Sequence, residues 1–289
     1  MASPIEARRR PLAHDAGTIS CLEWPRNGAP PLLFSHATGF NALTYNSLLA
    51  PLAGGFCAAA IDYRGHGFTT LTVEPGLATG WTIFCSDLAA ALSQLTSKPA
   101  ILVGHSMGAS VSLMVAALAP SLVRALLLIE PVLLEPMIPF APNRLAVRAA
   151  QRRNLFPSID AALEAYRGRG VFASWPETVL HNYLAGGLLP NTDGTLRLAC
   201  PPEWEAEIYR EAPIDIARLA GTISCPLSLM HGTIESTASR CQLDAIRALK
   251  PESRIVAVEG ASHFLPIEKP HLVREEIISI RERTSQLRV

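Results

Sequence analysis

The stretch Leu102–Ser110, LVGHSMGAS, joins an apolar run to the pentapeptide Gly-His-Ser-Met-Gly and continues with small and apolar residues. The apolar run predicts a buried β-strand, and the residues after the pentapeptide predict a helix. The glycines two positions before and after Ser106 allow a turn that is too tight for larger side chains. Such a turn would hold Ser106 in a strained backbone conformation, with its hydroxyl exposed at the carboxyl edge of a sheet.

The helix predicted after Ser106 gives this turn an electrostatic role. Backbone amides at a helix N-terminus are unpaired within the helix and favour negative charge. The Met107 N–H is therefore expected to donate a hydrogen bond to an oxyanion that develops beside Ser106. A Gly-x-Ser-x-Gly pattern also arises by chance in loops, but its place between a strand and a helix favours a nucleophilic serine here.

The chain between Pro31 and His263 alternates short apolar runs with longer segments of helical composition. This alternation predicts strands joined by crossover helices, and therefore a mostly parallel α/β sheet covered on both faces. An antiparallel hairpin around Asp15-Ala16-Gly17 is expected at the edge of the sheet. The predicted strands are Pro31–Ser35, Cys57–Ile61, Ala100–Gly104, Ala125–Ile129, Leu227–Met230 and Arg254–Val258. The predicted helices are Trp81–Leu95, Met107–Ala119, Ala238–Leu249 and Leu265–Arg283.

One segment interrupts this alternation. From Pro131 to about Ile214 no strand is predicted, prolines are frequent, and charged and aromatic residues cluster. We interpret the segment as a mainly helical insertion that forms a lid over the carboxyl edge of the sheet. The expected organisation is a core in two parts, residues 1–130 and 215–289, with the inserted lid at residues 131–214.

Composition narrows the classes of partner. The 289 residues include 25 basic and 25 acidic side chains, so no summed field would hold nucleic acid or an anionic membrane. No stretch has the length of a membrane-spanning helix and the N-terminus lacks the order of a signal peptide, so a cytoplasmic protein without stable membrane insertion is expected. The six scattered cysteines show no metal-ligand spacing, and no metal site is predicted. A small molecule is the expected partner; a homo-oligomer is compatible with the sequence but is not predicted.

Four stretches, in a fixed order, resemble a known superfamily. They are LLFSHATGF (Leu32–Phe40), DYRGHGFT (Asp62–Thr69), GHSMG (Gly104–Gly108) and EGASHFLPIEKP (Glu259–Pro270). With these residues the chain resembles the α/β-hydrolase superfamily over nearly its whole length. The resemblance implies the α/β-hydrolase fold, in which a mostly parallel central sheet has helices on both faces and an inserted helical lid.

A serine nucleophile needs a base that removes its proton and passes it to the leaving group. His263 follows the last predicted strand, which matches the superfamily's catalytic histidine. The resemblance also implies an acid three residues after a glycine in a strand-end loop, and Glu235 follows Gly232 in this way. Glu130 in LLLIEP, where some relatives place the acid, is the alternative. The histidines in motifs at strand ends are interpreted as structural: His36, His66, His105 and His231.

The resemblance implies a second oxyanion donor beside the Met107 N–H. In relatives it is the amide of the residue after a His-Gly dipeptide, which by position is Thr38. This chain has Ala37 where the superfamily usually has glycine, so the Gly39 N–H is the alternative donor. The stretch DYRGHGFT is expected to brace loops and is assigned no chemistry.

These roles imply acyl transfer through an acyl-enzyme on Ser106, without a metal or cofactor. The function expected first is a serine hydrolase, specifically a carboxylesterase, that cleaves small-molecule esters of small to medium acyl chains. A lactonase, thioesterase, acyltransferase or carbon–carbon bond hydrolase would use the same triad, and a ligand-binding member of the fold is the non-enzymatic alternative. Six aromatic residues of the lid are expected either to wall the substrate pocket or to form the lid's own core: Phe156, Tyr166, Phe172, Trp175, Tyr183 and Trp204.

Overall fold

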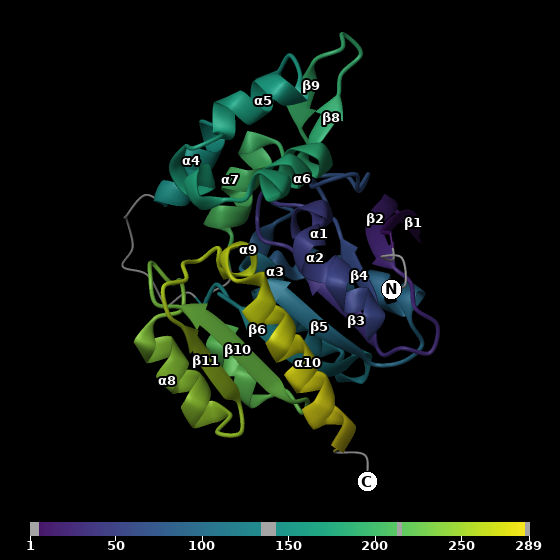
Figure 1. The fold of residues 1–289 in the computed structure, drawn as a ribbon, viewed down its shortest axis with the longest axis vertical. Helices are drawn as coiled ribbons and strands as arrows, with labels where there is room; N and C mark the ends of the chain where they lie inside the picture. The colour runs from purple at the N-terminus through teal and green to yellow at the C-terminus, as the bar shows by residue number, and fades with distance from the viewer. Residues whose placement is uncertain (1–5, 134–142, 213–215, 287–289) are drawn as a thin grey trace.

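The computed structural model describes residues 6–133, 143–212 and 216–286, and its centre is an eight-stranded sheet (Figure 1). The strand order is β1-β2-β4-β3-β5-β6-β10-β11. The pairs β1–β2 and β2–β4 are antiparallel, and the other neighbours are parallel. The bounds are β1 Arg8–His14, β2 Gly17–Trp24, β3 Pro31–Ser35, β4 Cys57–Ile61, β5 Ala100–His105, β6 Val123–Ile129, β10 Leu227–Gly232 and β11 Arg254–Val258. The six predicted core strands and the edge hairpin are all present.

Residue alternation along β5 separates two hydrophobic cores, one on each face of the sheet. Leu102 belongs to the core that contains residues of α2, α3 and α8, whereas Ile101 and Val103 belong to the core that contains residues of α1 and α10. The bounds of the core helices are α1 Asn46–Leu49, α2 Thr82–Leu95, α3 Met107–Leu118, α8 Arg240–Leu249, α9 Leu265–Glu268 and α10 Pro270–Gln286. Short 3-10 helices are η1 Ala42–Tyr45, η2 Ala50–Gly54, η3 Thr79–Trp81, η4 Pro120–Leu122 and η6 Ile216–Gly221. Helices therefore cover both faces, as predicted.

The prediction of one continuous helix over residues 265–283 is wrong, because the structure has two helices there, α9 and α10. The division falls at Lys269, whose φ of −131° and ψ of 52° are not helical. Pro270 follows directly, and a proline disfavours the helical conformation in the residue before it. Proline is tolerated at the first position of a helix, so α10 begins there.

The segment between β6 and β10 forms a separate layer, which we call the insertion and define as residues 143–212. Figure 1 shows its helices gathered at one end of the molecule, beside the core. Its elements are α4 Arg144–Ala150, β7 Leu155–Phe156, α5 Ile159–Tyr166, η5 Gly170–Ser174, α6 Glu177–Gly187, β8 Leu188–Pro190, β9 Leu196–Leu198 and α7 Pro202–Arg210. The antiparallel sheet β7-β9-β8 was not predicted, because strands of two or three residues are too short to show alternation. The predicted end of the lid, residue 214, lies outside the described residues.

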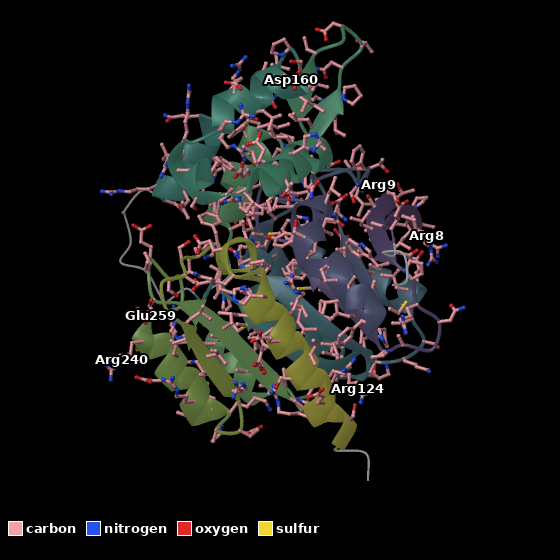
Figure 2. The ribbon with its side chains drawn as sticks, in the orientation of Figure 1. Arg8, Arg9, Arg124, Asp160, Arg240 and Glu259 are labelled. Carbon is pink, nitrogen blue, oxygen red and sulfur yellow. The ribbon has the colours of Figure 1, made fainter. Side chains whose placement is uncertain are left out.

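Charged side chains are spread around the molecule. Those labelled in Figure 2 lie on separate sides: Arg8 and Arg9 on β1, Asp160 on the insertion, Arg240 and Glu259 near α8, and Arg124 near α10. In the part of the chain that the structure describes, no helix has both the length and the apolar character needed to cross a membrane.

In the turn between β5 and α3, the glycines lie in close contact with backbone atoms of neighbouring segments. Ser106 has φ 56° and ψ −119°, a conformation that L-residues rarely adopt. A Cβ placed on Gly104 would lie 2.4 Å from the Gly108 carbonyl oxygen, and one placed on Gly108 would lie 2.3 Å from the Ser35 carbonyl oxygen. Only glycine allows these approaches, so the predicted tight, strained turn is present.

Gly108→Ala is expected to lower the free energy of unfolding by about 2–3 kcal/mol or more, because the added methyl group would meet backbone that cannot move aside. Urea denaturation monitored by circular dichroism measures the change. Gly54→Ala is the matched control, because a Cβ at Gly54 meets nothing within 4 Å. Equal stability of the two variants would contradict this account of the turn.

Candidate active site

The end of β5 presents Ser106 to a cavity at the carboxyl edge of the sheet. The Ser106 N–H donates to the Ile129 carbonyl at the end of β6, 3.0 Å away, which fixes the residue against the neighbouring strand. The residue is 7% exposed, and it lines a cavity of about 620 Å³. The nucleophile predicted from sequence therefore has both a fixed backbone and access to a cavity.

His263 lies in the loop between β11 and α9, and its side chain reaches Ser106. The Ser106 hydroxyl is 3.1 Å from His263 Nε2, within the range of a hydrogen bond to a general base. The other ring nitrogen, Nδ1, lies 3.3 Å from Glu130 Oε2 and 3.2 Å from Thr237 Oγ1. The structure thus brings together the predicted nucleophile and base.

The preference for Glu235 as the acid must be corrected. The structure places the alternative carboxylate, Glu130, beside the His263 imidazole. Glu130 directly follows β6, and β6 is the neighbour of β5, the strand that ends at Ser106. Glu235 follows β10, one strand further away. Its side chain is exposed and makes no hydrogen bond or ion pair with the described part of the chain. The spacing from Gly232 pointed to the loop after β10, which holds Glu235. The order of strands in the sheet decides instead that Glu130 contacts the histidine.

The end of β10 and the loop after it have a different role: they donate hydrogen bonds to the fully buried Glu130 carboxylate. Oε1 accepts from the Gly232 N–H at 2.6 Å and from the Ser236 hydroxyl at 2.8 Å. Oε2 accepts from the Thr237 N–H at 2.8 Å and from the Thr237 hydroxyl at 3.0 Å. Burial alone would raise the pKa of Glu130, but the hydrogen bonds from His263, Gly232 and Thr237 hold it down at about 2. The acid is therefore ionised at neutral pH.

Two backbone amides in the site can bind an oxyanion. The N–H groups of Thr38 and Met107 have no hydrogen-bond partner among the described residues, and both residues are buried beside Ser106 or line its cavity. The alternative donor, Gly39, is excluded because its N–H donates to His66 Nε2 at 3.0 Å. Burial lowers the pKa of His66 to about 3, so its neutral ring can accept this bond. Thr38 and Met107 remain the candidate donors.

A hydrogen-bond network that sequence reasoning missed connects three loops of the site. His105, which we interpreted as structural, donates from Nε2 to the His263 carbonyl at 2.7 Å. Its Nδ1 accepts from the Tyr45 hydroxyl at 2.7 Å, and the Tyr45 oxygen accepts from the Ala37 N–H at 3.2 Å. Burial lowers the pKa of His105 to about 3, which keeps the ring neutral and able to donate and accept. The only signal in the sequence was the position of His105 next to Ser106.

The cavity is lined by the core and by the insertion. Of the six aromatic residues proposed from sequence, Tyr166, Phe172 and Tyr183 line it. Phe156, Trp175 and Trp204 do not, and they are buried in hydrophobic clusters. Four further aromatic residues line the cavity: Phe40, Trp81, Tyr209 and Phe264. Within the described residues, no group of three or more His, Cys, Asp or Glu side chains could hold a metal ion.

The geometry fits nucleophilic acyl transfer. A hydroxyl, an imidazole and an ionised carboxylate are connected in series. Two residues with unpaired amides accompany them: Thr38 lines the same cavity as Ser106, and Met107 directly follows Ser106 in the chain. This arrangement can deprotonate the hydroxyl, stabilise the imidazolium that forms, and bind a developing negative charge.

Comparisons with known proteins show similarity to hydrolases. A family model described as "Alpha/beta hydrolase family" matches residues 32–276. The chain is 28% identical over 264 residues to a 2-(acetamidomethylene)succinate hydrolase of Mesorhizobium japonicum, covering 91% of this chain and 92% of that protein. It is 31% identical to an esterase of Mycobacterium tuberculosis over 52% of this chain and 49% of that one. A crystal structure of E-2-(acetamidomethylene)succinate hydrolase aligns with a TM-score of 0.78 at 25% identity, covering 96% of this chain and all of that one.

Glu130→Gln is expected to lower kcat for an activated ester by about 10³–10⁴-fold, because a neutral amide cannot stabilise the imidazolium. Glu235→Gln removes the same charge from the neighbouring loop and should retain nearly full activity. Initial rates with p-nitrophenyl butyrate measure both. Loss of activity in Glu235→Gln with retention in Glu130→Gln would reverse the assignment of the acid.

The Glu130 carboxylate is also expected to contribute a pH-dependent part of stability. Since its pKa falls from an ordinary value of 4.5 to about 2 in the folded state, its contribution is complete above about pH 4.5 and is lost as the pH falls towards 2. Over that window wild type should lose on the order of 3 kcal/mol more unfolding free energy than Glu130→Gln. Urea denaturation from pH 6 to pH 2.5 measures this difference, and parallel pH curves for the two proteins would contradict it.

Proposed function

The chain belongs to the alpha/beta hydrolase family, and we propose that it hydrolyses carboxylic esters of small to medium acyl chains through an acyl-enzyme on Ser106. The observation that carries this proposal is the series Ser106 Oγ, His263 and Glu130, with separations of 3.1 and 3.3 Å, beside a cavity large enough for a small ligand.

In the first half of the reaction, the Ser106 oxygen attacks the ester carbonyl while His263 Nε2 accepts the hydroxyl proton. The Glu130 carboxylate stabilises the imidazolium through Nδ1. The carbonyl oxygen becomes an oxyanion and accepts hydrogen bonds from the N–H groups of Thr38 and Met107. His263 then gives its proton to the leaving alkoxide, and the acyl group stays on Ser106.

In the second half, water replaces the alcohol. His263 Nε2 takes a proton from the water as the water oxygen attacks the acyl carbon, and the same two amides bind the second oxyanion. Collapse of this intermediate breaks the bond to Ser106 Oγ, which regains its proton from His263, and the carboxylic acid leaves. A thiol ester, a lactone, an acyl acceptor other than water, or a carbon–carbon bond next to a carbonyl would use the same groups.

The substrate range follows from the cavity. Its lining on the core side includes the aromatic residues Phe40, Trp81 and Phe264. The Phe264 ring contacts His263, and the Phe40 ring stacks on Phe264. A cavity of about 620 Å³ falls in the range that holds drug-sized ligands, which supports acyl chains of small to medium length.

The test is hydrolysis of p-nitrophenyl esters from acetate to decanoate, together with intact mass after reaction with a fluorophosphonate. Wild type should turn over many times and gain a single adduct. Ser106→Ala should lose the adduct and at least about 10³-fold of the rate, because the nucleophile is gone.

Ser86→Ala is the matched control, because Ser86 is an exposed serine on α2, outside the cavity, and this variant should behave as wild type. If well-folded wild type shows neither turnover nor adduct, the hydrolase proposal fails and the ligand-binding alternative takes its place.

A further inference from the structure

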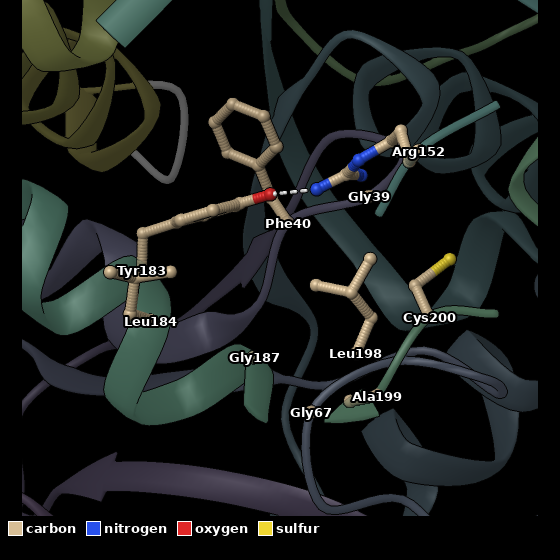
Figure 3. Close-up of a pocket in the computed structure, with 10 residues that line it drawn as sticks. All are labelled: Gly39, Phe40, Gly67, Arg152, Tyr183, Leu184, Gly187, Leu198, Ala199 and Cys200. Carbon is tan, nitrogen blue, oxygen red and sulfur yellow. Dashed lines mark hydrogen bonds between the residues drawn. The ribbon is translucent and has the colours of Figure 1, made fainter. Parts of the chain in front are cut away.

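On the side of the cavity that the insertion forms, Arg152 bonds to three other lining residues. Arg152, just after α4, pairs through Nη1 with Glu205 of α7. Its Nη2 donates to the hydroxyl oxygens of Tyr166 at 3.2 Å and Tyr183 at 2.7 Å. Figure 3 shows the contact between Arg152 and Tyr183 beside Gly39 and Phe40. Three helices of the insertion and the loop after α4 therefore place polar groups at one point of the cavity.

Hydrogen-bond chemistry makes this wall rich in donors. A guanidinium has only N–H donors, so the Tyr166 and Tyr183 oxygens must accept from it, and each phenol keeps its own hydrogen to donate. Among the described residues there is no acceptor for the hydroxyl hydrogen of Tyr166, Tyr183 or Tyr209, all of which line the cavity. Burial raises the pKa of Tyr183 and of Tyr209, so both stay protonated at neutral pH.

The charged side chains that line the cavity also favour an anionic ligand. Glu205 is the one carboxylate among the described lining residues, and Arg152 engages it. Arg148 adds a second guanidinium on α4, and it forms no ion pair with the described residues. With two arginines and one glutamate, the lining carries an excess of one positive charge. A bound group that supplies acceptors and one negative charge would complement it.

The wall adjoins the oxyanion site. A Cβ placed on Gly39, the residue after Thr38, would lie 2.6 Å from Glu205 Oε1 and 3.3 Å from Arg152 Nη1. A substrate whose carbonyl oxygen accepts from the Thr38 N–H would therefore reach the donors of the wall with a linker of a few carbon atoms. The apolar residues of the cavity, such as Phe40 and Phe172, would contact that linker.

We propose that this donor-rich wall, formed by Tyr166, Tyr183, Tyr209, Arg148 and Arg152, binds a carboxylate of the substrate. The preferred substrate is then an ester that carries a free carboxylate a few carbons from the scissile carbonyl. This inference rests on the proposed function, because it assigns the group that the ester presents beside the catalytic serine.

The test compares three p-nitrophenyl esters of similar length: the hydrogen adipate, its methyl-capped diester and the heptanoate. Wild type should hydrolyse the carboxylate ester with a kcat/KM about 10-fold or more above that of the capped ester, because hydrogen bonds to a charged group discriminate strongly against a neutral one. Tyr183→Phe and Tyr166→Phe should each lower kcat/KM for the carboxylate ester about 10-fold more than for the heptanoate.

A matched pair of charge removals controls for net charge. Arg148→Gln should reduce the preference for the carboxylate ester. Arg153→Gln should leave it unchanged, because the Arg153 guanidinium lies over the Phe156 ring, 4.7 Å from its centroid, and does not line the cavity.

A binding measurement separates failure of this inference from failure of the proposed function. Calorimetric titration of Ser106→Ala with monomethyl adipate and with dimethyl adipate needs no hydrolysis, and only the monoanion should bind measurably. Binding without turnover in wild type would uphold the carboxylate subsite and reject the hydrolase. Turnover with the capped ester or the heptanoate as the better substrate, and no change of preference in the tyrosine variants, would reject the subsite and leave the hydrolase standing.

Discussion

The close backbone packing of the β5–α3 turn is the constraint on which the active site depends. Gly104 lies against the Gly108 carbonyl, and Gly108 lies against the Ser35 carbonyl of β3. These approaches hold Ser106 in its strained conformation and tie its N–H to the Ile129 carbonyl. As a result the nucleophile, the first amide of α3 and the end of β6 have fixed positions relative to one another. The strain at Ser106 is tolerated because the backbone packing around the glycines on both sides leaves no room for another conformation.

The candidate site also requires that the buried Glu130 carboxylate stay ionised. A carboxylate without solvent would ordinarily take up a proton or destabilise the fold. Glu130 avoids both because it accepts hydrogen bonds from Gly232 at the end of β10 and from Ser236 and Thr237 in the loop after it. His263 adds a further bond. Glu130 itself has a φ of 48°, which directs its backbone out of β6 at this point. The ends of β6 and β10, which are far apart in sequence, therefore together keep the Glu130 carboxylate ionised.

The hydrogen-bond network of His105 connects the loop of the candidate oxyanion site to the loop that carries His263. Through Tyr45 it reaches the Ala37 N–H in the loop of the oxyanion site, and through the His263 carbonyl it reaches the loop of the base. Since the buried imidazole remains neutral, the network keeps one arrangement of donors and acceptors at physiological pH. The packing of Gly39 against Glu205 adds the insertion to the same assembly, so the oxyanion loop is held from both the core and the insertion.

Local sequence patterns were sufficient to predict the features that depend on local chemistry. Apolar runs located the core strands, and the paired glycines identified the turn at Ser106. The position of His263 after the last strand, together with the resemblance of its loop to the α/β-hydrolase superfamily, identified it as the candidate base. Tertiary structure decided the features that depend on which strand ends are neighbours. It placed Glu130 rather than Glu235 at the imidazole, because β6 lies next to β5 while β10 lies beyond it. It also gathered Arg152 and Tyr183 in one cavity wall, since hydrogen bonds between separate helices leave no periodic trace in the order of residues.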